Sequence, residues 1–217
     1  MSFQNIDKNA LLKTINEAKK QKGNKNFTQS MDLIITTHGL NLKKPENRIR
    51  CVIKLPNSIG NEKKIIVFAD SNINDSAKSA GADKVMNNSE IDTLAGNKKE
   101  GKKLVGNYDF FLSEPKMIKK VGQILGFAMG PKGKSPQVIT PTTDMKKMIS
   151  ELKNSVNIYL KSRPEISSKI GDETMESETL AENAHTFIST FNQELGEKGR
   201  IANICFKTTM GKTVKVK

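Results

Sequence analysis

The sequence has no tryptophan, two cysteines and two histidines among its 217 residues. Cys51 and Cys205 each lie in an alternating apolar segment, so we expect small buried side chains of a reducing compartment and no disulfide framework. His38 and His185 are far apart and have no ligand-type neighbours, whereas a zinc site needs a tighter cluster of histidines and cysteines. We therefore predict a protein with no metal and no cofactor.

Long apolar segments are also missing. No run approaches the roughly 20 apolar residues that a membrane-spanning helix needs, and residues 1–20 lack the apolar core of a secretory signal. No serine, cysteine or histidine stands in a recognisable nucleophile arrangement, and two isolated histidines offer little for acid–base catalysis. These absences favour a cytoplasmic protein that is not an enzyme and has no membrane partner.

Positive charge dominates what is present. The chain has 36 lysines and arginines against 23 aspartates and glutamates, a net charge of +13. Such an excess attracts polyanions over long distances, and release of the counterions condensed on nucleic acid would drive much of the binding. A merely soluble, lysine-rich surface is the alternative, but the charge favours nucleic acid as the partner.

Both ends of the chain carry amphipathic patterns. Asp7 can cap a helix that runs to about Gln21, and residues 31–36 form an apolar run rich in β-formers. In residues 48–55 apolar and polar side chains alternate, which predicts a strand with one buried face and three positive charges on the other. Further strands at 156–160, 165–170 and 200–208 are expected, with a helix over 180–195 that ends at Gly196.

The middle of the chain has a different pattern. Residues 65–69 are apolar without alternation, as in a strand buried on both faces of a parallel sheet. Helices and strands then alternate. We expect a helix at 74–80, a strand at 83–86, a lysine-rich helical stretch from Ser89, a strand at 108–112, a helix from Pro115 toward Ile124 and a helix from Asp144 to Lys153.

This contrast predicts two domains. Residues 1–64 and 154–217 together would form an α+β domain with an antiparallel sheet and two helices. Residues 65–153 would form a small doubly wound α/β domain inserted into it, so that only two connections join the domains.

One segment almost matches a phosphate-binding loop. The pattern needs glycine where Ala128 stands, Pro131 removes a backbone donor, and Pro136 lies where a helix should begin. The favoured interpretation is a stiff basic loop. A P-loop-like nucleotide hydrolase that uses Gly130–Ser135 is the alternative function.

Hydroxyl groups gather in a turn near the carboxyl terminus. Thr208 and Thr209 precede Met210 and Gly211. Threonine hydroxyls can bond ribose 2′-OH groups, and a glycine lets the backbone approach a ligand closely. A fraying basic tail is the other interpretation.

Other candidates for RNA binding lie elsewhere. Phe27 follows a Gly-Asn break and can pack on a ribose or base, or else belong to the core. Lys161 and Arg163 end a strand before Pro164 and can bridge phosphates, or simply be solvated.

Several segments together carry a resemblance that no single one would. In chain order they are Asn26–Ser30, Lys44–Arg50 with Leu55 and Pro56, Tyr108–Phe111, Met129–Pro136, Thr208–Gly211 and Val214–Lys217. This ordered set spans nearly the whole chain and resembles the L-one family of large-subunit ribosomal proteins in its archaeal form.

The resemblance implies a fold class and a function. The fold would be α/β (α+β), a discontinuous two-layer α+β domain with an antiparallel sheet plus an inserted Rossmann-like three-layer α/β domain. The protein would bind the rRNA stalk next to the tRNA exit site and assist release of deacylated tRNA. It would also bind a similar fold in its own mRNA and repress translation, and it would act as a monomer within the ribosome.

The resemblance and the basic strand face together predict an RNA-binding set. Asn26 departs from the basic residue that is usual in the family, so one phosphate contact is expected to be missing. The predicted RNA-binding residues are Phe27, Thr28, Arg50, Lys54, Lys161, Arg163, Thr208, Thr209, Met210 and Gly211.

Overall fold

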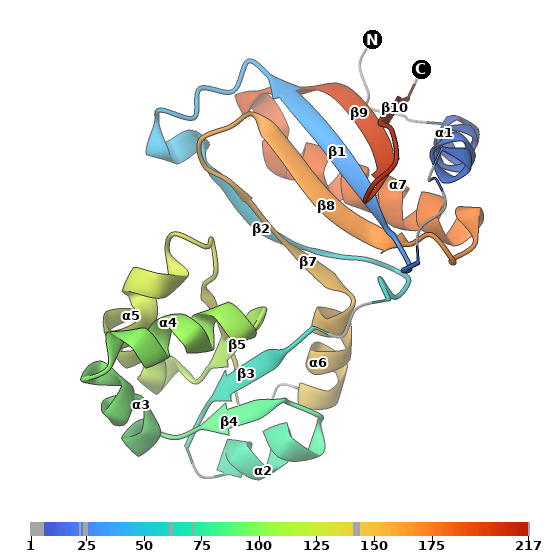
Figure 1. The fold of residues 1–217 in the computed structure, drawn as a ribbon. Helices are drawn as coiled ribbons and strands as arrows, with labels where there is room; N and C mark the ends of the chain where they lie inside the picture. The colour runs from blue at the N-terminus through green and yellow to red at the C-terminus, as the bar shows by residue number, and fades with distance from the viewer. Residues whose placement is uncertain are drawn as a thin grey trace. The chain divides into compact units, whose positions relative to one another are not determined.

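The chain divides into two compact units (Figure 1). Unit 1 comprises Met1–Asn61 with Asn154–Lys217, and unit 2 comprises Glu62–Lys153. The computed structural model describes residues 7–21, 23, 26–60, 63–70, 72–140 and 144–216.

Unit 1 is built on antiparallel strands. A four-stranded sheet has the order β10-β9-β1-β8, and a separate two-stranded sheet pairs β2 with β7. The strands are β1 (Ser30–His38), β2 (Ile49–Lys54), β7 (Ser155–Leu160), β8 (Glu165–Asp172), β9 (Arg200–Thr208) and β10 (Val214–Lys215). Because β1 pairs with β8 and β9, the first and last parts of the chain form one sheet.

Two helices cover one face of this sheet. In α1 (Lys8–Lys20) the carboxylate of Asp7 accepts a hydrogen bond from the Asn9 amide at 3.0 Å, so Asp7 is the predicted cap. The longer helix, α7 (Ser177–Leu195), ends at Gly196, whose φ of 50° favours glycine. Short 3₁₀ turns occupy Pro45–Asn47 and Gly196–Lys198. Helices on a single face leave the opposite face of the sheet for solvent or a ligand.

Unit 2 is a parallel sheet between two layers of helices (Figure 1). The strand order is β4-β3-β5-β6, and every residue of β3 and β5 is buried, as the unbroken apolar runs predict. The strands are β3 (Ile65–Phe68), β4 (Lys84–Met86), β5 (Phe110–Ser113) and β6 (Pro136–Val138).

The helices of unit 2 are distributed over both faces. On one face lie α3 (Asn88–Ala95), α4 (Lys98–Asn107) and α5 (Pro115–Met129), and on the other α2 (Asn72–Ser79) and α6 (Met145–Lys153). The antiparallel sheets of unit 1 and the parallel sheet of unit 2, with helices in both units, confirm the predicted fold class.

Local differences from the sequence predictions have simple causes. The expected single helix from Ser89 is two helices, because Asn87 caps α3 through a capping box with Glu90, and Asn97 caps α4 after the break at Gly96. α5 continues beyond Ile124 to Met129.

The two cysteines are free but only partly buried, contrary to the expectation of small core side chains. Burial is still enough to raise the pKa of Cys51 to about 11, with the charge of Glu194 acting in the same direction. Burial also raises the pKa of Cys205.

The near match to a phosphate-binding loop has a different role. The ammonium of Lys134 donates hydrogen bonds to the carbonyl oxygens of Val105, at 3.0 Å, and Tyr108, and lies 5.8 Å from the centre of the Phe111 ring. Burial lowers the pKa of Lys134, while the nearby Asp109 opposes this shift. The segment continues into β6 and not into a helix, since β6 begins at Pro136. Lys134 thus binds carbonyl oxygens at the carboxyl-terminal end of α4. Its ammonium group is therefore not directed to a nucleotide phosphate, as the alternative function of a nucleotide hydrolase requires.

Replacing Lys134 with methionine should destabilise unit 2. Methionine fills the same space but leaves two partly buried carbonyl oxygens without their donor, which costs about 1–3 kcal/mol. Since Tyr108 and Tyr159 are the two tyrosines of the sequence and lie in different units, Tyr108 fluorescence in a Tyr159→Phe background reports on unit 2. Urea unfolding followed in this way should give a lower midpoint for Lys134→Met.

The exposed neighbour Lys132 provides the control, because Lys132→Met removes the same charge and should leave the urea midpoint within error of the parent protein. Equal midpoints for the two variants would contradict a structural role for Lys134.

Candidate RNA-binding surface

A turn at residues 208–211 is held against the start of β1. The Ser30 amide donates to the hydroxyl oxygen of Thr209 at 3.1 Å, and the Thr209 amide donates to the Ser30 carbonyl at 3.1 Å. The Met210 amide donates to the side-chain oxygen of Gln29 at 3.0 Å, and the Gly211 amide closes the turn on the Thr208 carbonyl at 3.1 Å. Gln29 itself is buried. This set of bonds, called the clamp below, gives the turn one defined shape.

Two large apolar side chains project beside the clamp. Phe27 is 52% exposed and lies two residues before Gln29 of the clamp, and Met210, whose amide belongs to the clamp, is 61% exposed. Thr28 and Thr209 are also exposed. The exposure of Phe27 decides against a core role for this ring. Large exposed apolar groups beside hydroxyls provide the stacking and polar contacts that RNA recognition uses.

Thr208 differs from the prediction. Its side chain is 0% exposed, so its hydroxyl does not reach the surface. The cause is strand alternation, since Thr208 points the same way as Phe206 and Ile204, both of which are core residues. Thr208 shapes the turn through its backbone and cannot contact RNA with its hydroxyl in this conformation.

The open face of the sheet adds two lysines that sequence analysis did not select. Lys207 and Lys169 are the strand partners of Asp32 on either side of β1, and both ammonium groups act to lower the pKa of Asp32. Burial is the larger influence and raises that pKa. Lys169 also forms an ion pair with Asp172 at 2.6 Å. The alternation of β9 was the available signal, because it directs Lys207 away from the core one residue before the buried Thr208.

Lys161 and Arg163 lie at the opposite end of the sheet from the clamp. Both are exposed and belong to the β7–β8 connection, where the Pro164 carbonyl accepts a hydrogen bond from the Thr37 amide at 2.7 Å. Thr37 is near the end of β1 and Ser30 is at its start, so at about 3.3 Å per residue these regions are roughly 20–25 Å apart. The predicted RNA-binding residues therefore form two groups and not one surface.

The second group lies beside a basic pocket. Arg50 packs over the Tyr159 ring, with 5.0 Å between guanidinium carbon and ring centre, and Tyr159 is one residue from the end of β7. A pocket of about 430 Å³ opens here. Its lining residues are Leu40, Asn41, Leu42, Lys43, Arg48, Lys161, Ser162 and Pro164. Lys54 belongs to neither group directly, since it pairs with Ser155 at the far end of β7.

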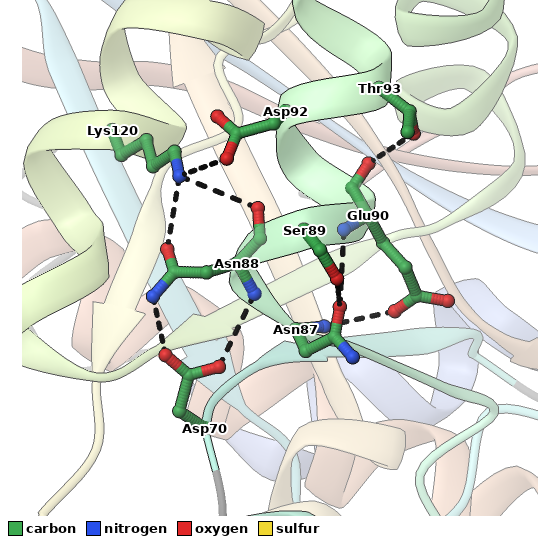
Figure 2. Close-up of polar contacts among 8 residues, drawn as sticks. All are labelled: Asp70, Asn87, Asn88, Ser89, Glu90, Asp92, Thr93 and Lys120. Atoms are coloured by element: carbon green, nitrogen blue, oxygen red, sulfur yellow. Dashed lines mark hydrogen bonds and ion pairs between the residues drawn. The ribbon is translucent and has the colours of Figure 1, made fainter.

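Unit 2 has a polar network beside the carboxyl ends of its strands, where doubly wound sheets bind ligands. Figure 2 shows that Asp70 accepts hydrogen bonds from the amide and side chain of Asn88, and that Lys120 reaches Asn88 and, at 2.8 Å, Asp92. These groups bind one another and join β3, α3 and α5. We therefore interpret the network as structural, because its bonds hold these elements of unit 2 together.

The described ranges lack two other kinds of functional feature. Within them no three histidine, cysteine, aspartate or glutamate side chains are grouped so that they could hold a metal ion. In the same part of the chain, no helix has the length and apolar character needed to cross a membrane.

Comparison with known proteins assigns the chain to a family. Residues 14–212 match the sequence model of the ribosomal protein L1p/L10e family. The large ribosomal subunit protein uL1 of Methanothermobacter thermautotrophicus is 37% identical over 208 residues, which cover 95% of this chain and 98% of the relative. The protein of the same name from Archaeoglobus fulgidus is 37% identical over 97% of this chain and 99% of its own length. For Pyrococcus abyssi the identity is 35%, and both chains are covered completely. With matches of this extent over both units, the chain belongs to the ribosomal protein L1p/L10e family.

Proposed function

We propose that this chain is a structural constituent of the large ribosomal subunit and binds the rRNA stalk next to the tRNA exit site. Family membership and the name of its relatives, large ribosomal subunit protein uL1, support the ribosomal part of the proposal. The net charge of +13 supports RNA as the partner. The observation that carries the stalk contact is the clamp, with Phe27 and Met210 exposed beside it.

The stalk contact would depend on a preformed shape. The clamp fixes the backbone of residues 209–211 before RNA arrives, so little conformational entropy is lost on binding. The oxygen of Thr209 accepts from Ser30 and keeps further acceptor capacity for a ribose 2′-OH. Phe27 and Thr28 would contact a base or sugar, while Lys207 and Lys169 on the open sheet face would attract phosphates.

The opposite end of the sheet would contact a second RNA, the exit-site tRNA. The β7–β8 connection with Lys161 and Arg163 lies roughly 20–25 Å from the clamp, beyond the reach of one small contact. Arg50 packs on Tyr159, close to the start of this connection. Basic residues around a pocket suit a backbone contact that can be made and released. We propose that this end holds deacylated tRNA during its release.

Regulation of translation follows from the same surface. A clamp of fixed shape selects RNA by fold, so an mRNA that forms a stalk-like fold would compete for it. Binding of the protein to such a fold in its own mRNA would repress translation once rRNA sites are filled. Cytoplasmic ribosomes are the place of action in this proposal.

Thr209→Val should weaken stalk binding by about fivefold to tenfold, because the clamp loses its side-chain acceptor. Filter binding to a stalk rRNA fragment at physiological salt measures the change. Thr93→Val, an exposed threonine in unit 2, makes the same chemical change and should not alter the affinity. Unchanged affinity of Thr209→Val would remove this residue from the RNA surface.

Phe27→Ala should reduce stalk affinity by about tenfold, the effect of losing one stacked base or sugar. Its thermal unfolding midpoint should stay close to that of the parent protein, since half of the ring is already in solvent. Phe27→Tyr preserves an aromatic face and should restore most of the affinity. Equal binding by the alanine and tyrosine variants would argue against stacking.

The double variant Lys161→Gln/Arg163→Gln should separate the two ends of the sheet. Its affinity for the stalk fragment should change by less than about twofold, because the clamp is distant. Its affinity for deacylated tRNA should fall severalfold, with a smaller dependence on salt. A loss of stalk binding as large as that of Thr209→Val would contradict the division into two contacts.

A further inference from the structure

Unit 2 has a row of positive charges along α4. Lys98 and Lys102 are exposed and four residues apart, so they lie one above the other on the helix, and Gly106 continues the row. The ammonium nitrogen of Lys132 lies 3.3 Å from the position that a Cβ atom on Gly106 would take. Lys98, Lys102 and the ammonium group of Lys132 thus mark one line along the helix, called the α4 row below. α4 contains four lysines, of which Lys98 and Lys102 belong to this row. Glu100, the acidic residue of α4, is two positions from both Lys98 and Lys102 and hence on the opposite side of the helix from them.

An exposed aromatic ring lies beside the α4 row. Phe127 on α5 is 41% exposed, and its ring lies 3.6 Å from the position that a Cβ atom on Gly101 would take. Gly101 is the residue before Lys102. Because it has no side chain, the ring can lie against α4 next to the lysines.

These features are unfavourable for an ordinary surface helix. Like charges four residues apart repel each other, two glycines in ten residues lower helix propensity, and an exposed phenylalanine gains little from burial. Only Gly101 and Val105 of α4 are buried, and Leu104 is partly buried. The repulsion between Lys98 and Lys102 and the low helix propensity of exposed Gly106 both fall on the exposed side of α4, which indicates a binding role for that side.

We propose that the α4 row and Phe127 bind an unpaired RNA strand, with phosphates along the lysines and one base stacked on the ring. A basic track beside an aromatic platform is the arrangement by which proteins hold single strands. Membership of a ribosomal protein family makes RNA the nucleic acid concerned. This contact lies in unit 2 and does not rest on the stalk-binding surface proposed for unit 1.

The first test measures charge in the full-length protein. The probe is a fluorescent 12-nucleotide oligouridylate, and binding is followed by anisotropy over a salt series. Lys98→Gln/Lys102→Gln/Lys132→Gln should weaken binding and lower the salt slope by about 2, because each lysine that neutralises a phosphate of a single strand contributes roughly 0.7 to that slope. The control Lys78→Gln/Lys146→Gln/Lys147→Gln removes the same charge from exposed positions on α2 and α6. Equal weakening in the two triple variants would overturn the proposal.

The second test measures stacking. Phe127→Leu keeps an apolar contact with α4 and should weaken oligouridylate binding by about tenfold without changing the salt slope. The same factor is expected in a Thr209→Val background, because the two surfaces are in different units. Unfolding midpoints must match the parent protein. Unchanged binding by a folded Phe127→Leu variant would overturn the proposal, as would tighter binding of a 12-base-pair RNA duplex that does not depend on Phe127.

Discussion

The pairing of β1 with both β8 and β9 is the constraint on which unit 1 depends. It places Ser30 beside Asp172 and Met31 beside Thr208, so residues from distant parts of the sequence become neighbours at one end of the sheet. The helices on one face bury Met31, Leu33 and Ile35 completely. Since the buried face fixes the strand register, the same pairing also determines which side chains lie on the open face.

The spacing of apolar residues along the sequence was sufficient to predict much of the fold. Alternation in residues 48–55 predicts a strand buried on one face, and the unbroken apolar run at 65–69 predicts a strand buried on both faces. Both segments are strands of the expected kind. Residues 136–138 gave no such signal, because β6 is an edge strand that begins with proline and leaves Val138 exposed. The lysine-rich helical stretch is divided into α3 and α4 by the cap at Asn97, and the spacing of apolar residues does not predict this cap.

The candidate site was less accessible to sequence reasoning, for a physical reason. Residue type indicated Thr209, Met210 and Phe27, whose side chains or backbone lie at the clamp end of the sheet. Whether Lys161 lies near these residues depends on the direction and pairing of strands that are distant in the sequence, and a local sequence pattern does not give this information. The hydroxyl of Thr208 suggested a surface position, but Thr208 is two residues after Phe206 on β9, so its side chain lies on the same, buried face of the strand. In unit 2, the sequence around Lys134 resembles a phosphate-binding loop, but the structure shows that this lysine binds backbone carbonyl oxygens.

The clamp also has a consequence for the order of synthesis. Thr209 follows Ser30 by 179 residues, and the whole of unit 2 is made between them. Domains generally fold as units during synthesis, so the inserted unit can fold while β1 still lacks its neighbours. A nascent chain has no clamp until the turn after β9 has emerged, and it therefore acquires the proposed RNA-binding surface only when almost all of its translation is over.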